Sequence, residues 1–126
     1  SGQYLIKKIY YRNDRIHLPN IDFDTIPIEK KFGWCDDINS KYYNKLINFP
    51  FKKSAEELFR VDNIYDIVCI IDYNLNPIIK KKGSAIFLHI AKNDYSDTEG
   101  CIALNKKDLK VLLTKINTKT KLNIVG

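Results

Sequence analysis

The chain has 126 residues, of which 44% are hydrophobic, and this length predicts one domain, residues 1–126, with a substantial buried core. Its formal net charge of +6 suits an anionic partner, but only three of its 21 lysines and arginines are arginine, which argues against readout of nucleic acid bases. No apolar run approaches the roughly 20 residues that a membrane-spanning helix needs.

The first half of the chain predicts strands followed by a long loop. Residues 4–11 are rich in aromatic and β-branched side chains and predict a strand. A turn at 13–14 and an extended piece at 15–18 would complete a hairpin with it. Residues 19–50 lose periodicity but keep several aromatic side chains, which is typical of a packed loop. We expect this loop either to cover an edge of the sheet or to shape a substrate cleft.

The second half predicts two short helices and the centre of the sheet. A capping box at Ser54–Glu57 opens a helix through Phe59, and Asn105 caps a second helix that runs through Leu113. Two apolar strands should form the centre of the sheet, and a last strand should close the chain. The two central strands are expected at residues 65–73 and 84–90, and the last strand at 121–125. The expected fold is therefore mainly β with a few short helices.

Several residues with catalytic or metal-binding chemistry have simpler interpretations. His17 lies in the predicted hairpin without a ligand partner, so we expect it to be a surface or packing residue. Asp36 and Asp37 suit a turn or a contact with a substrate amine better than a metal site. Cys69 lies in an apolar strand and is expected in the core. Cys35 could line the site beside Trp34, form a disulfide with Cys101 under oxidation, or simply pack. No cofactor or metal is expected.

The strongest chemical signal is the pair His89 and Cys101. His89 ends the apolar run Ala85-Ile86-Phe87-Leu88, and the ends of strands are where sites open. Cys101 follows Gly100, whose backbone can turn sharply so that nearby N–H groups face an oxyanion. A histidine can activate a thiol for attack on a carbonyl. The pair predicts cysteine-dependent acyl transfer, although the spacing alone is a weak signal.

The motifs around this pair resemble those of a known family. A histidine is followed by Thr98-Glu99-Gly100-Cys101 and an apolar pair, which is similar to the catalytic segment of the YkuD-type L,D-transpeptidases. A branch of that family with a shortened loop also has a Gly-Trp-Cys-Asp-Asp segment with Tyr-Asn a few residues later, as found here from Gly33 to Asn44. The resemblance therefore covers most of the chain.

The resemblance implies a bacterial transferase of cell wall biogenesis and cell shape, with a β-sandwich or open barrel fold, in the periplasm or cell envelope. Cys101 would take an acyl group from a peptidoglycan stem peptide as a thioester, with His89 as base and then acid. Backbone N–H groups around Gly100 would bind the oxyanion, and a backbone carbonyl could orient His89. Carbapenems would be covalent inhibitors. The residues expected around the peptide are Trp34, Tyr43, Asn44, Tyr73, Ser84, Thr98 and Glu99, with Thr98 also bracing the turn.

Two positions depart from the better-known members. Glu99 stands where those proteins have a second histidine, and Ala103 stands where they have an arginine. The missing cation at Ala103 leaves the substrate preference open. Two alternatives therefore remain: an L,D-carboxypeptidase or endopeptidase that hydrolyses stem peptides, and an inactive wall-binding domain of the same fold. The chain begins Ser1-Gly2-Gln3 and has no methionine, so we expect a processed product that lacks some N-terminal residues of the domain.

Overall fold

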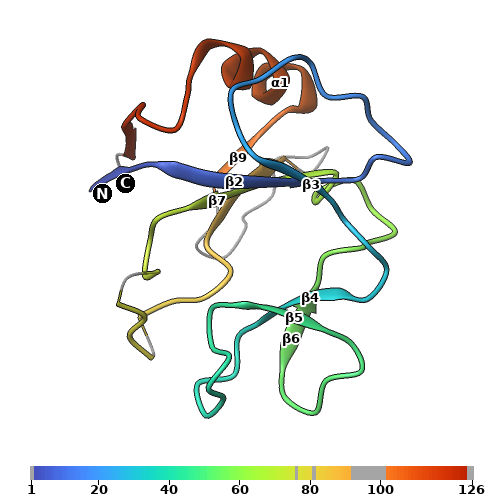
Figure 1. Ribbon diagram of the computed structural model, residues 1–126, viewed down its shortest axis with the longest axis vertical. Coiled ribbons are helices and arrows are strands. Elements are labelled where there is room, and N and C mark those ends of the chain that lie inside the picture. Colours follow the sequence, from blue (N-terminus) through green and yellow to red (C-terminus); the bar gives the residue numbers. More distant parts are fainter. Residues whose placement is uncertain (1, 76, 81, 92–101, 125–126) are drawn as a thin grey trace.

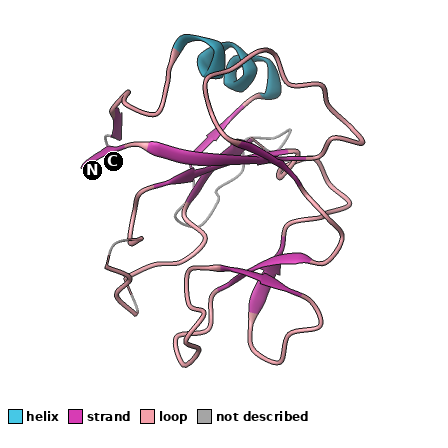
Figure 2. Cartoon of the chain, viewed as in Figure 1, coloured by secondary structure: helices cyan, strands magenta, loops and turns pink. Residues whose placement is uncertain are grey.

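The computed structural model describes residues 2–75, 77–80, 82–91 and 102–124. These residues form strands and one helix, which loops of varied length connect (Figure 2). The predicted mainly β class is confirmed, and the strands lie in open sheets. The elements are β1 (Gly2–Tyr4), β2 (Ile6–Tyr11), β3 (Thr25–Pro27), β4 (Phe32–Cys35), β5 (Leu46–Asn48), β6 (Ala55–Glu57), β7 (Ile67–Ile71), β8 (Phe87–Ile90), β9 (Ile102–Leu104), α1 (Lys106–Lys115) and β10 (Leu122–Ile124).

The largest sheet has the strand order β3-β2-β7-β8-β9. Its centre is antiparallel, because β7 pairs in that sense with both β2 and β8. Its edges are parallel pairs, β3 with β2 and β9 with β8. A second sheet has the order β5-β4-β6, and β1 pairs with β10 in a two-stranded ribbon that brings the two ends of the chain together. The predicted central pair, β7 and β8, is confirmed.

The elements form three layers, with the five-stranded sheet in the middle (Figure 1). Helix α1 covers one face of this sheet, and the three-stranded sheet lies below the other face. Each interface encloses an apolar core. The helix-side core contains Ile67, Cys69 and Ile71 of β7, whereas the core on the side of the small sheet contains Val68 and Ile70. Alternate side chains of one strand thus supply both cores.

The local sequence explains the central strand and the helix. All five residues of β7 are buried, as expected for an apolar strand covered on both faces. In α1, the side chain of Asn105 accepts a hydrogen bond from the backbone N–H of Asp108, and Leu109 and Leu113 are buried. The cap of this helix agrees with the prediction. None of the described helical residues forms a segment with the length and apolarity to span a membrane.

The predicted hairpin at the start of the chain is wrong. After β2, the N–H groups of Arg15 and Ile16 bond to the carbonyl of Arg12, and residues 15–18 form no strand. The chain instead returns through β3, which pairs parallel to β2 inside the stretch that was expected to be loop. Strands β4 and β5 also lie in that stretch. The predicted turn at 13–14 does form, but pairing with a segment farther along the chain decides which strand lies beside β2.

The helix predicted after Ser54 is also wrong. Residues 55–57 form β6, in which Glu56 pairs with Trp34 and Ala55 with Cys35 of β4. The capping-box pattern at Ser54 describes only what the isolated segment prefers. Pairing with β4 satisfies the same backbone groups and completes the small sheet, so the strand is favoured in the folded chain.

Candidate active site

His89 lies near the carboxyl end of β8 and is 1% exposed. In β8, Leu88 and Ile90 belong to the helix-side core and Phe87 to the other core. Alternation therefore directs His89 toward the side of the small sheet. Its ring packs against the ring of Tyr65 at 5.4 Å between centroids, with an interplanar angle of 81°. The predicted position at the end of a buried strand is confirmed.

One hydrogen bond assigns the tautomer of His89. Its Nδ1 lies 2.8 Å from the carbonyl oxygen of Ile90. A carbonyl oxygen only accepts hydrogen bonds, so Nδ1 carries a proton, and in the neutral ring the lone pair then lies on Nε2. An imidazole in this state can take a proton at Nε2. A backbone carbonyl therefore orients His89, as the resemblance implied.

The strand next to β8 begins one residue after Cys101. In the parallel pair of β8 and β9, Ile102 is opposite Leu88 and Ala103 is opposite His89. Ala103, the position without the expected cation, is thus the cross-strand neighbour of the histidine. Four residues predicted for the site lie outside the described residues and remain predictions: Thr98, Glu99, Gly100 and Cys101.

Asn44 is the centre of a buried polar cluster that precedes β8. It is 4% exposed, and its Oδ1 accepts hydrogen bonds from Trp34 Nε1 at 2.9 Å and from the Ala85 N–H at 3.3 Å. Its Nδ2 donates to the carbonyl of Asn74 at 2.7 Å. One amide thereby joins β4, the turn after β7 and the segment that enters β8. We call Asn44 and its partners Trp34, Asn74 and Ala85 the Asn44 hub.

Three other predicted substrate residues extend the Asn44 hub. The hydroxyl of Tyr43 accepts from the Gly83 N–H at 3.1 Å, and Ser84 Oγ donates to the carbonyl of Cys35 at 2.6 Å. The hydroxyl of Tyr73 donates to the carbonyl of Lys82. The structure therefore brings five of the predicted residues into one cluster. These are Trp34, Tyr43, Asn44, Tyr73 and Ser84.

The members of this cluster differ in exposure. Trp34 and Tyr43 are each 5% exposed, whereas Tyr73 and Ser84 are partly exposed. Trp34 also packs edge-on against Phe87 of β8 at 5.3 Å between ring centroids. The buried members thus contact β8 and the segment just before it from inside the protein. Contact of any of them with a peptide remains a prediction.

Strained backbone is concentrated in the Asn44 hub. The three described non-glycine residues with positive φ are Asn44 at 58°, Asn74 at 54° and Ala85 at 57°, and Gly83 has a φ of 126°. An alanine in this region costs roughly 1 kcal/mol, so the surrounding contacts must hold it there. Such residues occur preferentially at functional sites. The Asn turn residues could have been recognised from the sequence, but the strain at Ala85 has no local signal.

The two described cysteines are free and completely buried. Burial raises the pKa of Cys69 from 9.0 to about 12, so this side chain is a neutral thiol at neutral pH and a poor nucleophile. Its predicted place in the core is confirmed. Cys35 packs at the end of β4, and its backbone carbonyl accepts from Ser84 and Asn44. The burial and free thiol of Cys35 agree with the packing role, and a place in the lining of the site remains a prediction.

The raised pKa of Cys69 predicts a loss of stability in alkaline solution. A thiol that keeps its proton longer in the folded chain stabilises it below the unfolded pKa of 9.0, and this contribution is lost as the pH rises toward about 12. The free energy of unfolding, measured with denaturant, should therefore fall more steeply above pH 9.0 in the unsubstituted chain than in Cys69→Ala. Equal slopes for the two proteins would contradict this prediction.

The remaining candidates have structural roles or lie elsewhere. Asp37 Oδ1 accepts from the Asn39 N–H at 2.8 Å, a bond that lowers the pKa of Asp37 and defines a turn. His17 is exposed and lines a surface pocket of about 320 Å³, apart from His89. Among the described residues, no three His, Cys, Asp or Glu side chains gather to hold a metal ion.

Comparison with known proteins gave one result. Residues 1–124 match the family model YkuD, described as the L,D-transpeptidase catalytic domain. The match extends over nearly the whole chain, including β8, β9 and the Asn44 hub. Searches of the curated proteins and of the solved structures gave no match.

Proposed function

Because the chain belongs to the YkuD family of L,D-transpeptidase catalytic domains, we propose that it is a cysteine acyltransferase that crosslinks peptidoglycan stem peptides through a thioester on Cys101. Family membership implies L,D-transpeptidase-type activity on peptidoglycan. Our proposal adds three points to this: Cys101 is the nucleophile, the acyl group is transferred to an amine, and the protein acts in the periplasm or cell envelope.

The state of His89 is the observation that carries this proposal. Its Nδ1–H is bound to the carbonyl of Ile90, which leaves Nε2 as the basic nitrogen. The neighbouring strand starts at Ile102, which is covalently bonded to Cys101 and pairs with Leu88. Consecutive Cα atoms are about 3.8 Å apart, so the covalent bond between Cys101 and Ile102 supports Cys101 as the partner of His89.

The first half-reaction forms the thioester. Nε2 of His89 takes the proton of the Cys101 thiol, and the sulfur attacks the carbonyl carbon of the peptide bond before the terminal D-residue. The oxyanion is bound by backbone N–H groups around Gly100. The carbon–nitrogen bond then breaks, His89 returns the proton to the leaving amine, and the D-amino acid is released.

The second half-reaction transfers the acyl group. An amine of a second stem peptide attacks the thioester carbonyl, the carbon–sulfur bond breaks, and the Cys101 thiol recovers a proton through His89. Water in place of the amine would give a carboxypeptidase. Thr98 would brace the turn before the nucleophile, and Glu99 would face outward or meet a substrate ammonium, because a carboxylate beside the thiol would raise the pKa of that thiol.

The test is the position of the acyl group. After incubation with a stem tetrapeptide, intact-mass spectrometry should show one adduct whose added mass is that of the donor minus the released D-amino acid. Peptide mapping should place it on Cys101 and not on Cys35 or Cys69. A carbapenem should label the same residue, and Cys69→Ala should keep the adduct. An adduct on Cys35, or none with either probe, would refute the proposal.

Defined muropeptides then separate transfer from hydrolysis. With a donor and an amine acceptor present, the proposal predicts a crosslinked dimer that carries the donor acyl group. A product with only the shortened donor would assign hydrolysis to the same thioester. Absence of the thioester in a folded protein would favour the inactive wall-binding alternative.

A further inference from the structure

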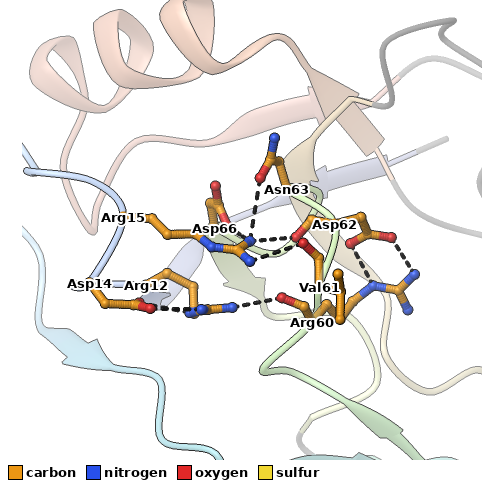
Figure 3. A network of polar contacts seen from close by, with 8 residues as sticks. All are labelled: Arg12, Asp14, Arg15, Arg60, Val61, Asp62, Asn63 and Asp66. Carbon is orange, nitrogen blue, oxygen red and sulfur yellow. Dashed lines mark hydrogen bonds and ion pairs between the residues drawn. The ribbon is translucent and has the colours of Figure 1, made fainter.

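Two of the three arginines of the chain, Arg12 and Arg15, bind one segment, residues 60–66, which contains the third. We call this segment the clamped segment (Figure 3). Arg15 Nη1 donates to the carbonyl of Asp62 at 2.7 Å and to Asp66 Oδ1 at 3.0 Å, and its Nη2 donates to the carbonyl of Val61 at 2.9 Å. A planar guanidinium can hold several acceptors at once, which an ammonium group cannot do in this geometry. Arg15 therefore holds the clamped segment along its length.

Arg12 holds the start of the same segment. Its side chain is 5% exposed and its guanidinium lies 3.5 Å from the centre of the Phe59 ring. Nη1 donates to the carbonyl of Arg60 at 2.7 Å. Hydrogen bonds to Asp14 raise the pKa of Arg12 and lower that of Asp14, so the pair stays charged. The charged hydrogen bonds and the contact with the Phe59 ring together hold the guanidinium of Arg12 at the start of the clamped segment.

The clamped segment contacts the histidine and the residue that follows it. The ring of Tyr65, which is 3% exposed, packs against the His89 ring. The carbonyl of Ile64 accepts a hydrogen bond from the N–H of Ile90 at 3.1 Å. Ile90 is also the residue whose carbonyl binds Nδ1 of His89. The segment therefore contacts the imidazole and, through the Ile90 N–H, the residue whose carbonyl orients the imidazole.

Tyr65 is held in turn from the small sheet. Its hydroxyl donates to Glu56 Oε2 of β6 at 3.1 Å. The guanidinium of Arg60 lies 5.5 Å from the centre of its ring, and Asp62 pairs with Arg60 at 2.6 Å. The tyrosine thus has contacts at its ring and at its hydroxyl, and its neighbours on the chain are fixed by Arg12 and Arg15.

We propose that Tyr65 is a positioning residue for His89, held in place by Arg12 and Arg15. The proposal rests on the proposed function, because it concerns the base of that site. The second side-chain torsion of histidine is broad, so packing against the ring restricts its plane. An aromatic ring packed against the imidazole limits this rotation. Tyr65 thereby keeps Nδ1–H on the carbonyl of Ile90 and leaves Nε2 as the nitrogen that takes the proton in the proposed reaction.

The test compares two substitutions of Tyr65 by spectroscopy and kinetics. Protein labelled with ¹⁵N-histidine reports the tautomer of each histidine by NMR, and the exposed His17 serves as the internal reference. Tyr65→Phe keeps the ring and should keep the Nδ1–H signature of His89. Tyr65→Leu should give a mixture of tautomers and a rate of acylation at saturating donor that falls by about 10- to 100-fold. KM should change little.

Arg15→Lys is the second variant, because Tyr65→Leu removes a buried ring and its folding must be checked by circular dichroism. Arg15→Lys keeps the positive charge but lacks the planar guanidinium, so it should cause part of the loss of the Nδ1–H signature of His89 that Tyr65→Leu causes. Lys107→Gln, an exposed change on α1, is the matched control and should leave the spectrum unchanged.

Two results would overturn the proposal. One is a folded Tyr65→Leu protein with the wild-type tautomer and acylation rate. The other, decisive if Tyr65→Leu does not fold, is an Arg15→Lys protein whose His89 signals match those of the unsubstituted chain. The tautomer is read without turnover, so absence of an acyl-enzyme in the unsubstituted protein would refute the proposed function and leave this test intact.

Discussion

Replacing His89 with asparagine is expected to slow formation of the acyl-enzyme by about 10²- to 10⁴-fold, the usual contribution of a general base. An asparagine Nδ2 lies close to the position of Nδ1 and can still donate to the carbonyl of Ile90. The substitution therefore removes the basic Nε2 while it keeps the hydrogen bond that holds the strand end. The rate is measured by quenched-flow mass spectrometry of the thioester with a stem tetrapeptide.

The matched control for this experiment is the other histidine. His17→Asn makes the same chemical change at an exposed position and should leave the rate unchanged. Circular dichroism should show that both variants are folded. A folded His89→Asn protein that acylates as fast as the unsubstituted chain would remove His89 from the mechanism, and a different base would have to be found.

Replacing Asn44 with alanine is expected to lower the free energy of unfolding by about 3–5 kcal/mol. The change removes three hydrogen bonds at once and leaves the indole N–H of Trp34 buried without its acceptor. It also places an alanine at a φ of 58°. Each of the three hydrogen bonds contributes about 0.5–1.5 kcal/mol, and the strained φ adds roughly 1 more. Guanidinium unfolding followed by circular dichroism measures the effect.

Two further variants separate the causes of that loss. Asn44→Gly tolerates the positive φ but lacks the amide, so it should recover only the smaller, conformational part of the loss. Asn39→Ala, an exposed asparagine in the same loop, should change the free energy of unfolding little. If Asn44→Ala unfolds at the same denaturant concentration as Asn39→Ala, the Asn44 hub does not stabilise the fold in the way described above.

The centre of the fold was predictable because its local signals agree with its tertiary environment. Residues 67–71 are uniformly apolar, which suits a strand covered on both faces. Asn105 and Asp108 mark the start of α1 through a cap that needs no distant partner. These elements are specified by neighbouring residues, so the sequence alone indicates them.

The edges of the fold were not predictable because their partners are distant in the chain. Residues 55–57 have a helix-start pattern but pair with β4, about 20 residues earlier. Residues 25–27 pair parallel to β2, where a hairpin was expected after the turn at 13–14. In both cases the backbone hydrogen bonds come from another part of the chain, and no local pattern records them.

The candidate site was predictable in its chemistry and less so in its support. His89 could be recognised from the apolar run before it, and its orientation by a backbone carbonyl was suggested by the resemblance. The contact with Tyr65 could not be seen, because an aromatic residue at the start of a strand normally indicates core packing. Cys101 lies outside the described residues, so its role as the nucleophile remains a prediction.

The double burial of β7 has a consequence for how the domain unfolds. Its alternate side chains belong to two cores, one beneath α1 and one above the small sheet that contains Trp34. Neither outer layer can detach without exposing one face of this shared strand. The helix and the small sheet therefore form a single cooperative unit, in which loss of either layer destabilises the strand that supports His89.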